Sequence, residues 1–278
     1  MRALSRELGD QMDAMYRSGI NTPAIGERLG VSVSGVIKIL KRRDVVMRPC
    51  SQRKYIVNDN VFDEINTEAA AYWLGFVYAD GCVHPERNVL TMNLSVKDKD
   101  HTEKFVSWAG GVCRELHSPS MHAGVARAEI RSALMLKSLQ SHGVTPRKSG
   151  NIRMPALDGK LVRHFIRGYF DGDGCIFVAR KALHHDRYGM NIVSNNEFLE
   201  DLQIALEVET GVCHGRTSPL GTSGKVRTLW FTVQKEIHTL LAYMYLGATV
   251  ALERKATMAR LILAAGCRDH RRAHAESV

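Results

Sequence analysis

The chain has 278 residues, of which 45% are hydrophobic and 24% are charged, the ordinary composition of a soluble globular protein. This composition excludes disordered, collagen-like and coiled-coil architectures, and the length allows two modest domains. No apolar run reaches the roughly eighteen residues of a transmembrane helix, and the first residues lack the apolar region of a signal peptide. We therefore expect a cytoplasmic protein without a membrane partner.

The charge is basic and unevenly distributed. Lys and Arg number 38 against 29 Asp and Glu, a net charge of +9, and residues 1–54 alone hold 11 basic and 5 acidic side chains. A basic excess favours a polyanionic partner such as nucleic acid, although a surface that serves only solubility would explain the charge equally well. The six cysteines form no Cys-x-x-Cys pair, which indicates reduced thiols in a cytosolic protein and no zinc ribbon.

Residues 10–43 have the pattern of three short helices. Met12 and Tyr16 give the first helix an apolar face, Ile25 gives one to the second, and Leu40 gives one to the third. The segment TPAIGERLGVSVSGVIKILKRR resembles a helix-turn-helix, the arrangement that places a helix in the DNA major groove. The alternative is a helical hairpin that only packs on its neighbour. The predicted DNA-binding domain spans residues 1–48, and its candidate DNA contacts are Ser32, Ser34, Lys38 and Arg42.

Two small glycines bear on this helical segment, and a linker follows it. Gly26 and Gly35 are expected to let the second and third helices approach closely. Residues 49–66 are polar and contain a proline, which predicts a linker before the next domain.

The rest of the chain repeats itself once. Residues 71–83 and 163–177 are both apolar helical runs that end in Asp-Gly-Cys, and their aspartates, Asp80 and Asp173, are 93 residues apart. Two later pairs of segments echo each other at intervals of 100 and 104 residues, namely 110–114 with 210–214 and 128–139 with 232–243. The order of features is the same in both halves. We therefore expect a duplicated unit and a monomer with internal pseudo-twofold symmetry.

Each half has the pattern of an α+β unit. Residues 90–97 alternate without a break, which predicts a strand with Leu90 and Met92 toward the core and polar side chains on the other face. Helices are predicted at 98–108, 132–142, 196–210 and 236–246, so each half has the order αββαββα. A polar sheet face is what readout of base edges by strands requires, whereas a merely solvated sheet face is the alternative.

The two Asp-Gly segments carry the candidate chemistry. Gly75 and Ala79 in the first copy, and Gly168 and Gly172 in the second, place small residues four apart, which allows the two helices to pack closely. Each helix then ends at an aspartate, which opposes the helix dipole by roughly 0.3–1 kcal/mol. Two neighbouring carboxylates also repel each other. A bound divalent cation would remove both penalties, and Mg²⁺ suits carboxylates combined with water and phosphate oxygens.

These segments, WLGFVYADG (73–81) and IRGYFDGDG (166–174), resemble the two motifs of the single-chain LAGLIDADG homing endonucleases, and the resemblance covers residues 67–263. It implies halves at 67–160 and 161–278, the second with a basic C-terminal tail, whose sheets form a saddle over double-stranded DNA. It also implies that Asp80 and Asp173 bind catalytic Mg²⁺, for which Mn²⁺ substitutes, with the role of the Ala79 backbone left open. Cleavage would leave short 3′ overhangs.

The resemblance assigns further residues. Arg131 and Lys235 match a basic residue that follows the fourth strand near the attacking water, Asp98 and Asn195 match a polar residue after the second strand, and Lys255 is placed near the DNA backbone. The sixth motif position is Tyr78 in the first copy, where the family has an acid, and Asp171 in the second. The DNA contacts expected from the saddle are Arg87, Thr91, Asn93, Ser95, Lys97, Arg127, Arg180, Lys225 and Arg227.

The sequence thus predicts a site-specific, Mg²⁺-dependent double-strand DNA endonuclease of a bacterial or phage mobile element. One alternative is a catalytically silent transcription regulator that joins the same domain to a helix-turn-helix. A second is an RNA-binding intron maturase, which the helix-turn-helix disfavours because A-form RNA keeps its major groove too narrow for a helix.

Overall fold

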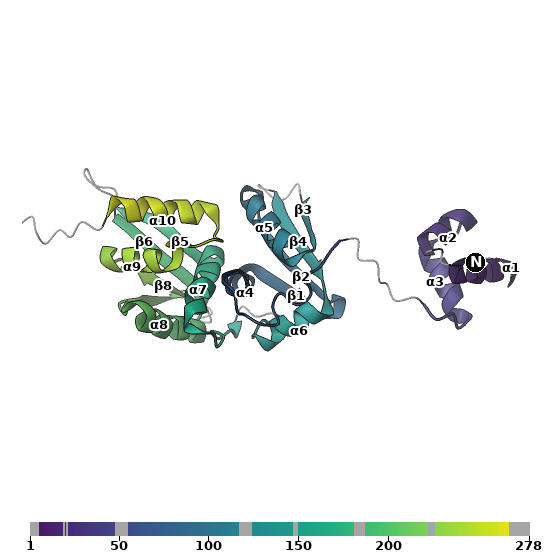
Figure 1. The fold of residues 1–278 in the computed structure, drawn as a ribbon, viewed down its shortest axis with the longest axis horizontal. Helices are drawn as coiled ribbons and strands as arrows, with labels where there is room; N and C mark the ends of the chain where they lie inside the picture. The colour runs from purple at the N-terminus through teal and green to yellow at the C-terminus, as the bar shows by residue number, and fades with distance from the viewer. Residues whose placement is uncertain are drawn as a thin grey trace, which may run out of the picture. The chain divides into compact units, whose positions relative to one another are not determined.

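The computed structural model describes residues 6–18, 20, 22–47, 55–116, 124–146, 150–180, 187–221 and 226–266 (Figure 1). The chain divides into two compact units, residues 1–54 and 55–278. Within the described residues, no helix is long and apolar enough to cross a bilayer.

The N-terminal unit consists of three helices, α1 (Arg6–Arg17), α2 (Thr22–Leu29) and α3 (Val33–Arg42). Ser32 caps α3 by accepting a hydrogen bond from the Gly35 backbone at 3.2 Å. Between α2 and α3 the chain turns at Gly30, whose φ of +64° is the left-handed conformation that favours glycine. The helices share one small core of buried side chains, formed by Met12, Tyr16, Ile25, Val36, Leu40 and Val45.

The two small glycines of this unit act differently from the prediction. A Cβ on Gly26 would lie 2.5 Å from the Val31 carbonyl oxygen, and one on Gly35 would lie 2.9 Å from the Val31 side chain. Both glycines therefore make room for the turn between α2 and α3 rather than for packing of one helix axis against the other. The third-helix residue Ile37 is half-exposed, so that helix packs through Val36 and Leu40.

Within the described residues, the first half of the larger unit contains three α-helices, two short 3₁₀ turns and four strands. Its sheet is antiparallel, with the order β1-β2-β4-β3. The elements are α4 (Glu68–Asp80), β1 (Gly81–His84), β2 (Val89–Ser95), α5 (Lys99–Ala109), β3 (Val112–Leu116), β4 (Val125–Arg131) and α6 (Ala133–Ser141). The predicted strand at 90–97 ends at Ser95, because Val96–Asp98 turns into a short 3₁₀ helix (η2).

The second half repeats this order and adds a final helix. Its sheet is again antiparallel, with the order β5-β6-β8-β7. The elements are α7 (Gly159–Asp173), β5 (Gly174–Arg180), β6 (Arg187–Asn195), α8 (Asn196–Thr210), β7 (Arg216–Leu220), β8 (Val226–Phe231), α9 (Gln234–Tyr245) and α10 (Glu253–Ala265). The predicted α+β class and the αββαββα order of both halves are confirmed, with α8 at the predicted bounds.

Helices α4 and α7 form the centre of the larger unit and lie between the two sheets (Figure 1). Residues 70–78 of α4 are all buried, as expected for a helix that is apolar on every side. Aromatic side chains of both helices fill the core around this pair, including Trp73, Phe76, Phe165 and Phe170, each with at most 1% of its surface exposed. The pair therefore joins the two halves through one hydrophobic core.

Candidate active site

The backbones of α4 and α7 touch where the small residues were predicted. A Cβ on Gly75 would lie 2.9 Å from the Tyr169 nitrogen and closer still to the Phe165 carbonyl oxygen. A Cβ on Gly168 would lie 2.9 Å from the Phe76 nitrogen and closer still to the Tyr72 carbonyl oxygen. Only glycine fits either position, so these two residues fix the separation and register of the helix pair.

The glycines that follow the two aspartates have a different role from a left-handed helix cap. Gly81 and Gly174 have φ values of −74° and −96°, which any residue can adopt. A Cβ on Gly81 would lie 2.6 Å from the Val77 carbonyl oxygen, and one on Gly174 would enter the Phe170 ring. Glycine is required here by space, because the chain passes directly from the last helical turn into a strand.

This geometry brings the two motif aspartates to the same end of the helix pair. The Asp80 Oδ2 atom lies 3.2 Å from the position that a Cβ on Gly172 would occupy, one residue before Asp173. Tyr169 lies beside both carboxylates. Burial and then the neighbouring charge of Asp173, with a smaller contribution from Asp80, raise the pKa of the Tyr169 phenol well above its usual value. The phenol thus stays protonated and donates to Ser194 Oγ at 2.8 Å.

A buried lysine from the last helix completes this end of α7. The Lys255 ammonium donates to the carbonyl oxygens of Phe170, Asp171 and Gly174 at 2.6, 2.8 and 2.6 Å. Burial lowers the pKa of Lys255 to about 8, while the charges of Asp171 and Asp80 act in the opposite direction. A cation at the C-terminal carbonyls of a helix offsets the helix dipole. Lys255 therefore supplies positive charge beside the Asp173 end of the site.

The sixth motif position differs between the halves. In the second half Asp171 is fully buried and accepts hydrogen bonds from Tyr72 at 2.8 Å, from Tyr245 at 2.6 Å and from the Leu252 backbone at 2.7 Å. Burial raises the pKa of Asp171, and these hydrogen bonds oppose the rise. In the first half Tyr78 occupies the position and donates one hydrogen bond to the His142 carbonyl. In neither half does this residue stand at the helix end with Asp80 and Asp173.

A second buried network ties the two halves together near the start of α4. Arg167 has no exposed side-chain surface, and it donates to Glu68 at 2.6 Å, to the Met244 carbonyl at 2.8 Å and to the Val250 carbonyl at 2.9 Å. Burial lowers the pKa of Arg167, and the Glu68 charge opposes this. Because all of these partners are intramolecular, the network stabilises the helix pair and does not form a ligand site.

The strand register separates Arg131 from the aspartates. Arg131 pairs with Val89, which pairs with His84, whereas Asp80 precedes Gly81 at the other end of β1. From strand spacings, the Arg131 and Gly81 backbones lie roughly 14 Å apart. Arg131 is exposed at the far end of the polar sheet face.

Lys235 is likewise placed away from Asp173. Its neighbour Gln234 binds the Tyr188 backbone, and Tyr188 pairs with Val178, four residues beyond Gly174 along β5. Val178 therefore lies roughly 13 Å from Gly174 along the strand. The basic residue that the structure brings to Asp173 is Lys255, which the 104-residue echo did not identify.

Lys235 is not the structural equivalent of Arg131, because the residue offset between the two halves differs from the one that the sequence repeat indicated. Gly81 pairs with Met92 and Gly174 with Ile192, and the strands beyond them pair Leu90 with Ile130 and Met190 with Phe231. The structural equivalents are therefore 101 residues apart in this region, and Ser132 and Val233 are the matching residues before α6 and α9. By this register Arg131 corresponds to Thr232, not to Lys235.

The predicted polar residues after the second strand lie in different surroundings. Asp98 is the N-cap position before α5, and it forms an ion pair with Arg254 at 3.1 Å. Asn195 is 2% exposed and donates to the Ile152 carbonyl at 3.0 Å and to Glu197 at 2.9 Å. Both side chains therefore have structural partners within the protein.

The candidate DNA contacts are partly on the polar sheet face. Asn93 and Arg127 are cross-strand neighbours, and the Arg127 Nε donates to Asn93 Oδ1 at 2.7 Å. Ser95 is exposed at the end of the same strand, while Arg87 and Lys97 are exposed in the adjoining 3₁₀ turns. In the N-terminal unit, the side chains of Ser32, Ser34, Lys38 and Arg42 are exposed.

Two candidate contacts are corrected by the structure, and two lie outside it. Thr91 is only 8% exposed and lies 3.3 Å from His84 Nε2, so its hydroxyl is covered. Arg227 is two residues from the buried Leu229 on β8, so both side chains lie on the helix-covered face of the sheet. Lys225 and the side chain of Arg180 lie outside the described residues.

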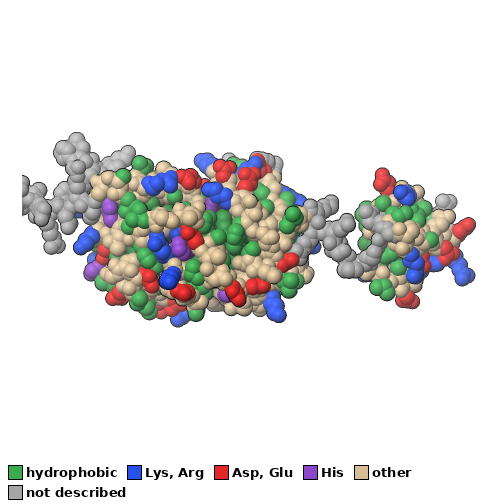
Figure 2. Space-filling view, in the orientation of Figure 1, with side chains coloured by type: hydrophobic (Ala, Val, Ile, Leu, Met, Phe, Trp, Pro, Cys, Tyr) green, Lys and Arg blue, Asp and Glu red, His purple; other side chains and the backbone are tan. Residues whose placement is uncertain are grey.

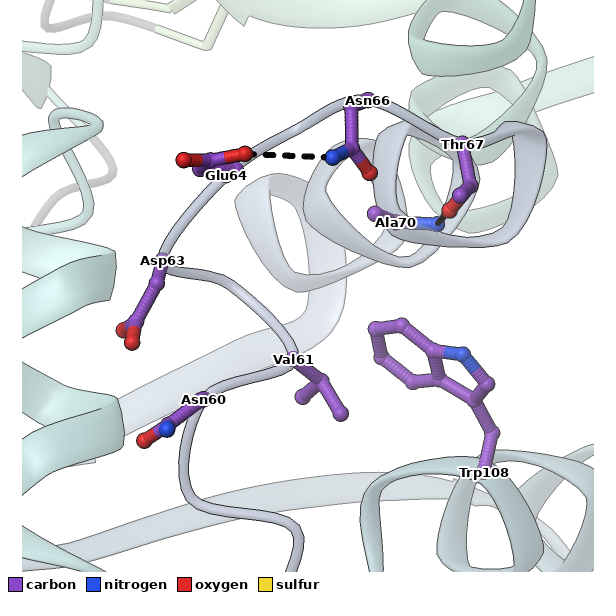
Figure 3. A pocket seen from close by; sticks show the side chains of 8 residues that line it. All are labelled: Asn60, Val61, Asp63, Glu64, Asn66, Thr67, Ala70 and Trp108. Atoms are coloured by element: carbon purple, nitrogen blue, oxygen red, sulfur yellow. Dashed lines mark hydrogen bonds between the residues drawn. The ribbon is translucent and has the colours of Figure 1, made fainter.

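Basic and acidic side chains are interspersed over the face of residues 55–266 drawn in Figure 2. A pocket of about 400 Å³ on the first half is lined by Asp63, Glu64 and Trp108, among others (Figure 3). Its carboxylates already accept hydrogen bonds, Asp63 from Ser138 and Glu64 from Asn66 at 3.2 Å. Neither Asp80 nor Asp173 lines this pocket.

Comparisons with known proteins agree with this architecture in the second half. Residues 160–243 match the family model described as a LAGLIDADG-like domain. The matched residues include most of α7 and its aspartate Asp173. An uncharacterized protein of Methanocaldococcus jannaschii, MJ0314, is 23% identical over 183 residues, which is 63% of this chain and 66% of that protein.

Solved structures of meganucleases are also similar. The meganuclease I-SmaMI bound to uncleavable DNA matches with a TM-score of 0.49 and 11% identity, covering 70% of this chain and 90% of that chain. The homing endonuclease I-LtrWI bound to target DNA matches with a TM-score of 0.49 and 13% identity, covering 74% of this chain and 91% of that chain.

Proposed function

We propose that the chain is a site-specific, metal-dependent endonuclease that cuts both strands of double-stranded DNA at a long asymmetric site. The observation that carries the proposal is the glycine-mediated contact of α4 and α7, which brings Asp80 and Asp173 to one end of a helix pair. Two carboxylates related by an internal twofold suit the two strands of a duplex, which are themselves related by a twofold. The LAGLIDADG-like domain at 160–243 supports the same reaction class.

The donor set at this end of the helices fits a hard divalent cation. Within the described ranges, no group of three or more His, Cys, Asp or Glu side chains could hold a metal, so the protein contribution would be Asp80 and Asp173. Mg²⁺ is commonly bound through one or two carboxylates together with water and substrate phosphate oxygens. When bound, the metal would polarise the scissile phosphodiester and lower the pKa of an attacking water.

The protein residues around the carboxylates would orient them and balance their charge. Lys255 places an ammonium against the carbonyl end of α7, which limits the negative potential beside Asp173. Tyr169 remains a hydrogen-bond donor next to both aspartates because its pKa is raised. In hydrolysis, a water oxygen bonds to phosphorus as the ester oxygen leaves, and the proton of the water passes to solvent or to a carboxylate.

The sheets would provide affinity and sequence selection. Their polar face carries Asn93 and Arg127, which are already oriented by a mutual hydrogen bond, and exposed Arg131 stands further along the same face. Amide and guanidinium groups read base edges in the major groove. We assign Arg131 to DNA contact rather than to proton transfer, because the register separates it from Asp80.

The N-terminal three-helix unit would add a second DNA contact. Ser34 and Lys38 of α3 are exposed on the face opposite the buried Val36 and Leu40, and the N-cap Ser32 is exposed at the start of the helix. A helix of this kind after a tight turn is the recognition element of a helix-turn-helix. The same unit also favours a second candidate function, a regulator that binds DNA without cutting it.

The test uses a plasmid library of random and gene-flanking DNA. Purified full-length protein is added with Mg²⁺ or with Ca²⁺, and all new DNA ends are sequenced. We expect discrete paired ends with 3′ overhangs in Mg²⁺ only. Selective retention of some sequences on the protein with no new ends in either metal would refute the nuclease and establish the regulator.

A further inference from the structure

In the first half, an extended segment of the chain fills a groove beside the sheet. Val57 forms a β-bridge with Gly110, the Gly111 nitrogen donates to the Ile56 carbonyl at 2.9 Å, and the Asn58 nitrogen donates to the Ala109 carbonyl at 3.0 Å. A Cβ on Gly110 would lie 2.6 Å from the Val57 Cα, so the segment crosses this glycine in direct contact.

Acidic and apolar side chains anchor the same segment, residues 55–63. Ser132 and Ser138 donate to Asp59 and Asp63, respectively. Phe62 is fully buried, and its ring lies 5.2 Å from that of Trp108. Val61 lies beside the same indole ring in Figure 3. The segment thus binds through main-chain hydrogen bonds, two carboxylates and a core aromatic.

The equivalent groove in the second half is open. Gly211 ends α8 as Gly110 ends α5, and both have positive φ, but nothing lies within 4 Å of a Cβ built on Gly211. Val233 and Thr239 stand at the positions of Ser132 and Ser138 by the 101-residue offset. These residues line a cavity of about 640 Å³, with Arg216 and Lys235 as its exposed basic side chains.

Two side chains in this groove lack contacts that a bound segment would supply. The Glu236 side chain is nine-tenths buried, its Oε1 is paired with His214, and its Oε2 has no hydrogen-bond partner among the described residues. A buried acceptor without a donor is destabilising, and a backbone N–H of a bound peptide would relieve that cost. Val233 is 49% exposed, although it lies between the end of β8 and the start of α9.

We propose that this groove, lined by Gly211, Val233, Lys235, Glu236 and Thr239, binds an extended acidic segment of another protein along the path that residues 55–63 follow in the first half. Gly211 and Val212 stand at the positions of Gly110 and Gly111, although the Val212 nitrogen, unlike that of Gly111, already donates to Thr210 Oγ1 at 3.3 Å. The basic side chains Arg216 and Lys235 complement carboxylates at the positions of Asp59 and Asp63. The groove lies away from Asp80 and Asp173, so this inference does not depend on the proposed function.

The test uses the chain's own segment as a probe. A fluorescent peptide of residues 55–64 has three acidic and no basic side chains, and its anisotropy is measured with full-length protein in the absence of DNA. We expect saturable binding, and we expect a peptide with Asp59→Asn, Asp63→Asn and Glu64→Gln to bind about tenfold more weakly, equivalent to about 1.4 kcal/mol.

Two substitutions at one position sharpen the test. Val233→Asp places a favourable N-cap residue on α9 and keeps the fold, but it puts a negative charge in the groove, so peptide binding should fall by about tenfold or more. Val233→Ser restores the hydroxyl that binds Asp59 in the first half, and binding should strengthen severalfold. The matched control Lys160→Glu, on an exposed turn of α7, should bind as wild type does.

Three results would overturn the proposal. The first is equal binding of the acidic and neutral peptides, and the second is unchanged binding by Val233→Asp. The third comes from sedimentation of the protein alone. Self-association that Val233→Asp abolishes would assign the groove to a second copy of this chain instead of another protein. Cleavage of DNA by Val233→Asp at the wild-type rate would show that any loss of peptide binding is independent of the nuclease.

Discussion

Helices α4 and α7 make equivalent backbone contacts with each other, but their C-terminal turns lie in different surroundings. Two residues before Asp173, the buried Asp171 accepts a hydrogen bond from the Leu252 nitrogen, and Lys255 donates to the Asp171 carbonyl oxygen. Around Asp80 the corresponding motif position is Tyr78, which makes one neutral hydrogen bond to the His142 carbonyl. Backbone contacts thus fix the symmetric part of the site, whereas the polar side chains that support the two helix ends differ between the halves.

This comparison has a functional consequence. A twofold arrangement of Asp80 and Asp173 requires only that the two helices cross at the same place, which the glycines ensure. The supporting groups need not be symmetric, because each acts on its own half. We therefore expect equal sensitivity of the two aspartates in cleavage and unequal sensitivity of the two halves in stability.

The largest expected effect tests whether cleavage depends equally on Asp80 and Asp173. Asp80→Asn and Asp173→Asn should each reduce double-strand cleavage by about 10³-fold or more, because each removes a proposed ligand of a metal that would stabilise transition-state charge. The measurement is linearisation of supercoiled plasmid bearing the identified site, in Mg²⁺. Normal thermal unfolding and DNA retention by both variants are the controls. Cutting by either variant at the wild-type rate would contradict the mechanism.

The next effect tests whether the sixth motif position contributes unequally to the stability of the two halves. Asp171→Leu leaves two buried tyrosine hydroxyls and the Leu252 nitrogen without their acceptor, and it should lower the free energy of unfolding by about 4 kcal/mol. Tyr78→Phe, at the matching position, loses one hydrogen bond and should cost about 1 kcal/mol. Urea denaturation measures both. Equal losses would show that the two helix ends are supported alike.

A third prediction concerns the shared backbone contact. Gly168→Ala forces a methyl group into the Tyr72 carbonyl and the Phe76 nitrogen, and it should destabilise the protein by about 3 kcal/mol. Gly150→Ala is the matched control, since nothing lies within 4 Å of its Cβ and its φ is not positive. If Gly168→Ala unfolded at the same urea concentration as the control, the helices would not be in the described contact.

The smallest effect depends on pH and concerns the first half. Burial lowers the pKa of His101 to about 3, from an ordinary value of 6.5, and its Nε2 lies 2.9 Å from the Tyr72 hydroxyl. The Tyr72 hydroxyl donates to Asp171, so the neutral imidazole donates to Tyr72. In the unfolded chain His101 binds a proton below about pH 6.5, whereas in the folded chain it stays neutral down to about pH 3. Stability is therefore complete above pH 6.5 and is lost as the pH falls through this window.

Between pH 6.5 and pH 5 this loss amounts to about 2 kcal/mol. His101→Gln keeps a hydrogen-bond donor without titrating, so the difference between the wild-type and variant free energies of unfolding isolates the histidine. Parallel pH profiles of the two proteins would show that His101 does not remain neutral in the fold.

Much of the architecture could be predicted because its signals are local. The spacing of Gly75 and Gly168 within apolar helices predicted a close helix pair, and the structure confirms it. The α8 helix occupies its predicted residues because its apolar periodicity and its terminal Gly211 are both encoded within one segment. The repeated order of helices and strands followed from the same periodicities.

The errors came from features that depend on register. A repeat interval of 104 residues matched Lys235 with Arg131. That interval holds only for β3 and β7, because the shorter connection between β7 and β8 returns the offset to 101 in the following strand and helix. Thr91 lies on the predicted polar face of its strand, but His84 of the neighbouring strand covers its hydroxyl. A one-residue or three-residue shift is invisible in a composition pattern and decisive for which side chains meet.

The two Asp-Gly helices, their duplication and the α+β order could be predicted from the sequence alone, because helical spacing and glycine placement act over a few residues. Three features depend on packing between distant segments: Lys255 at the C-terminal end of α7, the burial of Asp171 among hydroxyl donors, and the open groove in the second half. Lys255 lies 85 residues from Phe170 along the chain, and Asp59 lies 73 residues from Ser132. Contacts at such separations follow from packing and strand register, which no local pattern encodes.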